Sequence, residues 1–348
     1  MNIGAQFLRR LARLVLMAAP AAVATAILLG GAAFPAAASQ SYTLSTATAG
    51  GTYYPVGVAL ATLMRVKLEP TKQIGMSAIS TAGSAENIQL MRDKKAEFAI
   101  LQGLFGMYAM QGSGPLKADG PQPYIRSILM LWANVEHFLL AADEAKTGTM
   151  ADMAGLAGKK FAIGARDSGT EYSSRFILRN LGIDPDAMDL VYQGYGPSVD
   201  ALQKGEVVGV NPAAGAPVSV VIRAFAQMRD KVRGLEFTPE QAQRADGGAG
   251  LYWPHTIPVG TYPGQSREWK TIAQPNFLAV HADVPEADVY EITKAIFENT
   301  AFLNNIHAAT REISLDTALT RLPAPLHPGA VRYYREKGRE IPANLLAK

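Results

Sequence analysis

Short apolar runs alternate with amphipathic segments along most of this chain, and the alternation occurs in two consecutive blocks. Strands are expected at residues 42–46, 73–79 and 98–101 of the first block and at 160–164, 189–192 and 207–210 of the second. Helices are expected between and after these strands, at residues 56–67, 85–93, 170–181, 198–204 and 216–228. Strands that alternate with helices in this way form βαβ units and a parallel sheet. The sequence therefore predicts an α/β protein with two lobes of the same plan.

Two extended apolar segments connect the blocks and predict a hinge. Residues 137–142 lead out of the first block, and residues 276–281 lead back into it. We expect helices at residues 289–303 and 307–318 to cover the first lobe. The predicted organisation is a leader at residues 1–38, lobe 1 at 39–135 and 277–348, lobe 2 at 136–276, and hinge strands near 137–142 and 276–281.

The first 38 residues have the pattern of a secretory signal peptide. Arg9, Arg10 and Arg13 precede an uncharged apolar run at residues 14–33, and small residues follow at 36–38. This order is typical of a cleaved leader, although a run of this length is also compatible with a membrane anchor. We expect cleavage after Ala38 and a mature protein in the periplasm.

Removal of the leader leaves a chain without net charge. Lys plus Arg falls from 33 to 30 and then equals the 30 Asp plus Glu. A nucleic-acid-binding protein would need a basic excess clustered in a patch, so we exclude nucleic acid as a partner. The chain has no cysteine, which excludes disulfides, thiol catalysis and thiolate metal sites.

Histidine positions and nucleophile motifs give no sign of catalysis. The five histidines do not have metal-ligand spacing, and neither a Gly-x-Ser-x-Gly turn nor a Ser-His-acid set can be identified. We expect no metal and no cofactor, and we expect that the protein is not an enzyme.

Two loops of the first block carry groups suited to ligand binding. Ligands of open parallel sheets bind beyond the carboxyl ends of the strands. The loop at residues 49–55 offers flexible glycine and hydroxyl donors, and it is equally compatible with a plain tight turn. The loop at residues 80–87 could face the same cleft or only cap the following helix. The candidates in these loops are Gly51, Thr52, Tyr53, Tyr54, Ser84 and Asn87.

The second block contributes a third loop, at residues 165–170. Ser168, Gly169 and Thr170 would begin a helix, where hydroxyls, free backbone N–H groups and the helix dipole favour a carboxylate. Arg166 could clamp that carboxylate with two hydrogen bonds or remain solvated on the loop. Four further candidates lie at the ends of other strands: Gln102, Tyr192, Asn211 and Gly215.

Taken together, these loops resemble the TAXI family, the extracytoplasmic solute receptors associated with TRAP (tripartite ATP-independent periplasmic) transporters. The resemblance rests on Gly50-Gly51-Thr52-Tyr53-Tyr54-Pro55, on Thr81-Ala82-Gly83-Ser84-Ala85-Glu86-Asn87, on Leu101-Gln102 and on Ser168-Gly169-Thr170. It continues through residues 257–262, 289–294 and 326–338 and covers nearly all of the chain after the leader. The chain departs from the family pattern at Gly103, Leu104, Arg166, Asp167 and residues 210–213, which leaves the ligand open.

The resemblance implies a type II periplasmic-binding-protein fold, with two Rossmann-like lobes joined by a two-strand hinge. It implies a small carboxylate solute, either an amino acid such as glutamate or a dicarboxylate or 2-oxo acid, and a TRAP membrane permease as the partner. We expect a monomeric solute-binding receptor. A periplasmic sensor protein that signals to a receptor remains an alternative, as does an enzyme on the same scaffold.

Overall fold

The structure is a computed structural model that describes residues 40–347. These residues lie within one compact unit, Ala38–Lys348, and the leader expected at residues 1–38 lies outside the described part. Within residues 40–347, no helix combines the length and the apolar character needed to cross a membrane.

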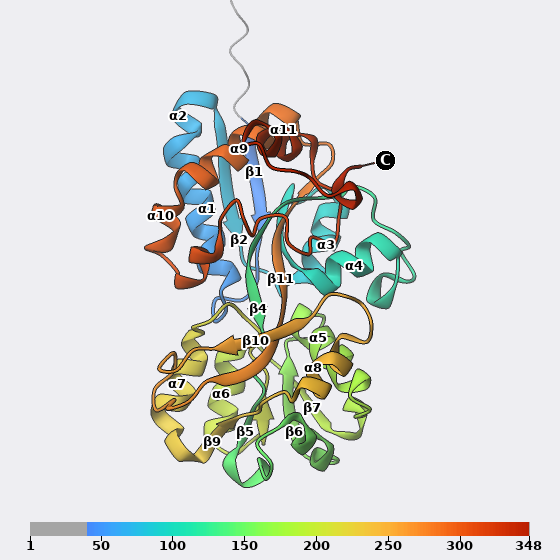
Figure 1. The fold of residues 1–348 in the computed structure, drawn as a ribbon, viewed down its shortest axis with the longest axis vertical. Helices are drawn as coiled ribbons and strands as arrows, with labels where there is room; N and C mark the ends of the chain where they lie inside the picture. The colour runs from blue at the N-terminus through green and yellow to red at the C-terminus, as the bar shows by residue number, and fades with distance from the viewer. Residues whose placement is uncertain (1–39, 348) are drawn as a thin grey trace, which may run out of the picture. The chain divides into compact units, whose positions relative to one another are not determined.

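The first sheet is built around three parallel strands (Figure 1). β1 (Gln40–Ser45) lies between β2 (Ile74–Ile79) and β3 (Phe98–Gln102). The long strand β11 (Trp269–His281) pairs antiparallel with β3, with β4 (Ile125–Val135) and with β10 (Trp253–Ile257). Every residue of β3 is buried, because helices cover both faces of the parallel strands.

The second sheet repeats this plan. β6 (Lys160–Gly164) lies between β7 (Asp189–Tyr192) and β8 (Gly209–Val210), and all three strands are parallel. β5 (Leu139–Ala141) then pairs antiparallel with β8 and with β9 (Val232–Gly234). In both sheets the first strand of the block lies between the second and the third, which confirms the repeated α/β plan predicted from the sequence.

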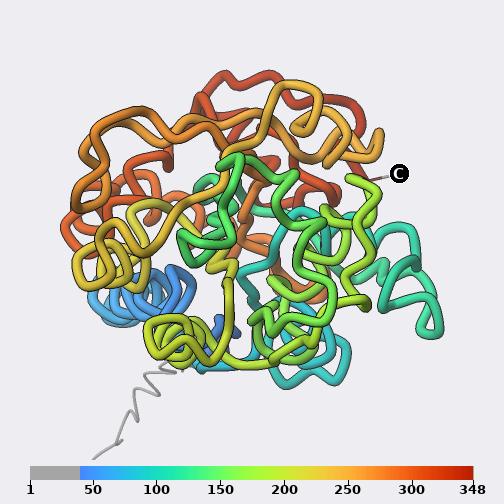
Figure 2. Tube along the Cα trace, turned by 90° about the horizontal axis from the view of Figure 1, so that it is seen from below, coloured from blue at the N-terminus to red at the C-terminus, as the bar shows by residue number. Residues whose placement is uncertain are grey.

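Each parallel strand leads into a helix. β1, β2 and β3 are followed by α1 (Tyr53–Lys67), α3 (Ser84–Arg92) and α4 (Gly103–Gln111), and β6, β7 and β8 by α5 (Gly169–Asn180), α6 (Tyr195–Gln203) and α7 (Ser219–Met228). Figures 1 and 2 agree that α1, α6 and α7 lie on one side of the strands, and α3, α4 and α5 on the other. In α1 the apolar spacing explains the packing, since Val56, Leu60, Leu63 and Met64 form one buried stripe.

Five further helices complete the unit. α9 (Glu286–Glu298), α10 (Thr300–Asn304) and α11 (Pro328–Glu336) lie beside the first sheet, as does α2 (Glu69–Lys72), while α8 (Pro239–Asp246) lies beside the second sheet (Figure 1). α8 begins with a complete capping box, because the side chains of Thr238 and Gln241 each accept a hydrogen bond from the other residue's backbone N–H.

The prediction of a helix at residues 307–318 is wrong. Only Ala308–Glu312 forms a short 3-10 helix, and turns follow it. Threonine side chains compete for the backbone here, since Thr310 Oγ1 donates to the His307 carbonyl at 2.8 Å and Thr317 Oγ1 to the Glu312 carbonyl at 2.6 Å. The Glu312 carboxylate also accepts from the Ala133 N–H at 2.8 Å, which holds the segment against β4.

Two stretches of chain connect the sheets. β4 ends at Val135 and β5 begins at Leu139, so the chain passes from one sheet to the other between them. β11 provides the return path, and at its start the Trp269 indole N–H donates to the Leu235 carbonyl at 2.8 Å. The passage from β4 to β5 overlaps the predicted hinge strand at 137–142. The predicted return strand at 276–281 forms the end of β11, which begins seven residues earlier, at Trp269. The lobe boundaries themselves stay a prediction.

Candidate functional site

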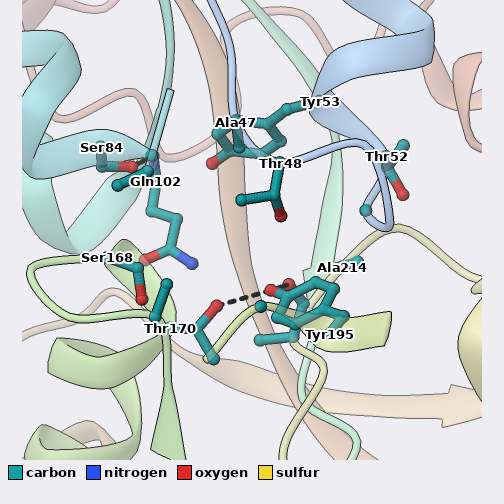
Figure 3. A pocket seen from close by; sticks show the side chains of 17 residues that line it. Ala47, Thr48, Thr52, Tyr53, Ser84, Gln102, Ser168, Thr170, Tyr195 and Ala214 are labelled. Atoms are coloured by element: carbon teal, nitrogen blue, oxygen red, sulfur yellow. Dashed lines mark hydrogen bonds between the residues drawn. The ribbon is translucent and has the colours of Figure 1, made fainter. Parts of the chain in front are cut away.

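A small cavity lies where the carboxyl ends of the parallel strands of both sheets meet. Its volume is about 40 Å³. The loops that follow β1, β2 and β3 form one wall, and the loops that follow β6, β7 and β8 form the other (Figure 3). The lining residues are Ala47, Thr48, Gly51, Thr52, Tyr53, Ala82, Gly83, Ser84, Gln102, Ala165, Ser168, Gly169, Thr170, Gly194, Tyr195, Ala213 and Ala214.

Five helices begin at this cavity. The first residues of α1, α3, α5 and α6, which are Tyr53, Ser84, Gly169 and Tyr195, all line it, and α4 begins directly after Gln102. The first N–H groups of a helix have no partner within that helix, and the helix dipole places a partial positive charge there. The arrangement therefore presents hydrogen-bond donors and positive potential to one point, as an anion-binding site does.

Gln102 extends its amide from the end of β3 into the space between the two walls (Figure 3). The residue is 3% exposed, and its backbone N–H donates to Ser84 Oγ at 3.1 Å. Its side-chain oxygen has no hydrogen-bond partner among the described residues. Leaving a buried polar group unpaired costs about 1–3 kcal/mol, so this amide is suited to pair with a bound solute.

Two tyrosines, the buried Tyr53 and the half-buried Tyr195, frame the cavity and are held by hydrogen bonds. The Tyr53 hydroxyl donates to Asn276 Oδ1 at 2.5 Å. The Tyr195 hydroxyl donates to the Ala213 carbonyl at 2.5 Å and lies 2.5 Å from Thr170 Oγ1. Burial raises the pKa of both phenols above the ordinary value, so both remain neutral at physiological pH.

Contacts across the cavity show that the two walls are closed on each other. Thr52 Oγ1, from the first wall, donates to the Gly215 carbonyl of the second at 3.2 Å. Beside the cavity the rings of Phe105 and Tyr172 meet edge to face, with centroids 5.4 Å apart. A Cβ placed on Gly169 would lie 2.6 Å from Gln102 Oε1, so any larger residue here would displace the Gln102 amide.

Eight of the fourteen residues predicted for the site line the cavity: Gly51, Thr52, Tyr53, Ser84, Gln102, Ser168, Gly169 and Thr170. They come from all three loops that the sequence singled out, together with the end of β3. Their role in binding stays a prediction.

The other six lie outside the lining, and their contacts explain why. Asn87 Nδ2 donates to the carbonyls of Thr46 and Ile100, which ties the ends of β1 and β3 together. Arg166 is exposed and stacks 3.9 Å over the Tyr192 ring. Asn211 Nδ2 donates to Glu136 Oε2 at 2.7 Å.

The remaining two of these six are Tyr54 and Gly215. Tyr54 is half-buried on α1. Gly215 packs against Trp132, so closely that a Cβ on Gly215 would lie 2.6 Å from the indole ring. Of the departures from the family pattern, only Ala213 of residues 210–213 lines the cavity. Neither Gly103 nor Leu104 lines the cavity, and the Leu104 N–H donates to Gln274 Oε1 of β11 at 2.9 Å.

Thr48 and Tyr195 line the cavity and were missed. Tyr195 lies where the loop after β7 meets the start of α6, beyond the end of a parallel strand, so the rule that identified the three candidate loops also applies to it. Tyr192, which was predicted in its place, is the last residue of β7.

No group of three or more His, Asp or Glu side chains within residues 40–347 is arranged to hold a metal ion.

The NMT1-like family model matches residues 44–338. The chain belongs to the NMT1-like family. The match begins within β1 and includes all other strands of both sheets and every residue that lines the cavity.

Several solved structures are similar to this NMT1-like protein. A protein of Bordetella bronchiseptica RB50 matches with a TM-score of 0.50 and 14% identity, over 86% of this chain and 98% of that one. MatC of Rhodopseudomonas palustris, solved with bound malate, matches with a TM-score of 0.49 and 15% identity, over 88% and 98%. The periplasmic aliphatic sulphonate binding protein SsuA of Escherichia coli matches with a TM-score of 0.42 and 13% identity, over 85% and 83%. The likeness to the Bordetella protein, over nearly the whole of that chain, agrees with the two-sheet α/β fold that the sequence predicts.

Proposed function

We propose that this protein is the extracytoplasmic solute receptor of a TRAP transporter. It would capture a small carboxylate between its lobes in the periplasm and deliver it to a membrane permease, without chemical conversion. The observation that supports this proposal is the convergence of five helix N-termini and the unpaired side-chain oxygen of Gln102 on one closed cavity.

The magnitudes are compatible with reversible capture. One helix N-terminus stabilises an anion by about 0.3–1 kcal/mol, and by up to about 2 kcal/mol in partly buried geometry. Five helix N-termini together would stabilise a bound anion by several kcal/mol, which is comparable to the effective cost of desolvating one carboxylate. A micromolar dissociation constant corresponds to about 8 kcal/mol in total, and hydrogen bonds from hydroxyl and amide groups would contribute the remainder.

Closure would proceed by rotation of lobe 1 (39–135 and 277–348) against lobe 2 (136–276) about the two crossings. A solute favours the closed state only through contacts that the open state lacks. The loops of both sheets line the cavity, so a solute there would touch both lobes only when they are closed.

The proposal is tested by calorimetric and thermal-shift screening of the purified protein with organic acids, neutral sugars and cations. We expect organic acids to bind and to raise the melting temperature, as a ligand specific for the folded state does. Binding of neutral sugars or cations alone would contradict a carboxylate receptor.

Removing two hydroxyls from the second wall should weaken binding. We expect Ser168→Ala combined with Thr170→Ala to raise the dissociation constant of a bound acid by roughly 5- to 150-fold, corresponding to about 1–3 kcal/mol for lost hydrogen bonds to a buried ligand. Isothermal titration calorimetry provides the measurement.

Ser168 also caps α5, because its Oγ accepts from the Glu171 N–H at 3.2 Å. Thr238→Ala is the matched control, since it removes the cap of α8, whose residues do not line the cavity. The control should lose stability without losing affinity, and equal affinity in both variants would show that the Ser168 loop is only a cap.

A further inference from the structure

The cavity is lined by uncharged residues only, among the residues that the structure describes. The two nearby arginines are engaged elsewhere. Arg166 stacks on Tyr192, and Arg175 forms ion pairs with Glu171 and Asp186. A solute in this cavity therefore meets the partial charges of helix ends and neutral polar groups, and no side chain of opposite charge.

This electrostatic balance suits one negative charge. All five helices present their N-termini, so the potential at the cavity is positive from both walls. That potential offsets the loss of hydration of a single carboxylate. A second carboxylate would require a second, equal compensation, for which the lining provides no lysine or arginine.

The same potential disfavours an ammonium group. A buried cation needs a carboxylate or several oriented acceptors in place of its water shell. No aspartate or glutamate lines the cavity. The Gly215 and Ala213 carbonyls are already engaged by Thr52 and Tyr195. The ammonium of an amino acid would therefore exchange its full hydration for the single unpaired acceptor at Gln102, which does not compensate for burial of its charge.

The size of the cavity favours a short molecule. Its volume is about 40 Å³, whereas one water molecule needs roughly 10–15 Å³. The Gln102 amide reaches into this space with an unpaired oxygen and can accept a hydrogen bond from a hydroxyl group of a solute.

We propose that the solute is a short organic monoanion, with one carboxylate and neither an amine nor a second acidic group, bound at the helix ends and contacted by Gln102. The inference rests on the proposed function, and it narrows the ligand class to exclude glutamate and dicarboxylates. Lactate is a member of this class that also carries a hydroxyl for Gln102.

Isothermal titration calorimetry with matched solutes tests the inference. Lactate is compared with alanine, which exchanges the hydroxyl for an ammonium, and with lactamide, which removes the negative charge. Propionate is compared with succinate, which adds a second carboxylate, and glutamate is included. We expect each monoanion to bind at least about 30-fold more tightly than its partners, corresponding to about 2 kcal/mol.

The outcomes separate the inference from the function on which it rests. If alanine, glutamate or succinate binds as tightly as the monoanions, the monoanion inference is wrong, while a carboxylate receptor remains supported. If no organic acid in the series binds, both proposals are wrong.

A charge placed in the cavity gives an independent test. Gln102→Glu would set a like charge against the bound carboxylate, and we expect at least a 100-fold loss of lactate affinity. Gln203→Glu, at the half-buried C-terminal end of α6, is the matched control and should keep the affinity within about twofold. Gln102→Met, which is neutral, covers the case that the charged variant does not fold, and it should lose about tenfold. Unchanged affinity in a folded Gln102 variant would overturn the role of Gln102.

Discussion

Replacing Glu136 with glutamine should raise the free energy of unfolding by about 3 kcal/mol at pH 8 and leave it almost unchanged at pH 4. Glu136 lies between β4 and β5, at the outward crossing between the sheets, and is fully buried. Burial raises the pKa of Glu136 from 4.5 to about 7, against the opposing effect of a hydrogen bond from Asn211. The titratable groups that face it are the hydroxyls of Tyr195 and Tyr252, and burial raises the pKa of both.

The sign follows from which state holds the proton more tightly. The folded protein keeps Glu136 protonated up to about pH 7, whereas the unfolded chain releases the proton near pH 4.5. The stability that Glu136 contributes is therefore complete below pH 4.5 and is lost as the pH rises to 7. A difference of 2.5 pKa units corresponds to about 3 kcal/mol, and glutamine, which cannot ionise, avoids this loss.

Urea denaturation of the wild type and the variant between pH 4 and pH 8 measures the effect. Glu206→Gln, at an exposed position, serves as the control and should change stability by less than about 0.5 kcal/mol throughout. A difference between wild type and Glu136→Gln that does not vary with pH would show that Glu136 does not titrate in this range.

A second large effect is expected at the point where the two walls of the cavity meet. Gly169→Val should weaken solute binding at least about 100-fold, corresponding to about 3 kcal/mol. A Cβ at Gly169 would lie 2.6 Å from Gln102 Oε1 and 3.1 Å from Ser84 Oγ, both on the opposite wall. A branched side chain would displace Gln102 and hold the walls apart, so the closed state would become less favourable.

Calorimetry and thermal unfolding together check this second prediction. Gly196→Val is the matched control, because Gly196 also lies in the first turn of a helix, and a Cβ there would meet no atom within 4 Å. The control should retain affinity, and both variants should remain folded because the open state accommodates the new side chain. Wild-type affinity in Gly169→Val would show that binding does not require the contact between Gly169 and Gln102.

The fold could be predicted because its signal is local. Apolar strands and amphipathic helices alternate, and the loops between them contain glycine and capping residues. The rule that ligands bind beyond strand ends was enough to select Ser84, Gln102, Ser168 and Thr170, which meet at one cavity. The exception was residues 307–318, where threonine side chains bond to the backbone and replace helical hydrogen bonds.

The orientation of individual side chains was less predictable. Arg166 lies on a loop that turns at Asp167. The φ of Asp167 is 59°, and its backbone N–H donates to the Glu171 carboxylate. The Arg166 guanidinium therefore stacks on Tyr192, outside the cavity. Asn87 is only three residues from Ser84 on the same helix, yet it bonds to strand-end carbonyls. These choices depend on neighbours from distant parts of the chain, which no local pattern reveals.

Strand β11 has a consequence for how the protein loses its structure. It supplies the antiparallel partner of β3 and β4, while its first residue, Trp269, is fixed to the backbone of Leu235 beside the second sheet. The first sheet is therefore incomplete until the ribosome has synthesised all of the second. The two halves of the molecule depend on one shared segment, so neither half is expected to persist as a folded fragment when the chain is cut between them.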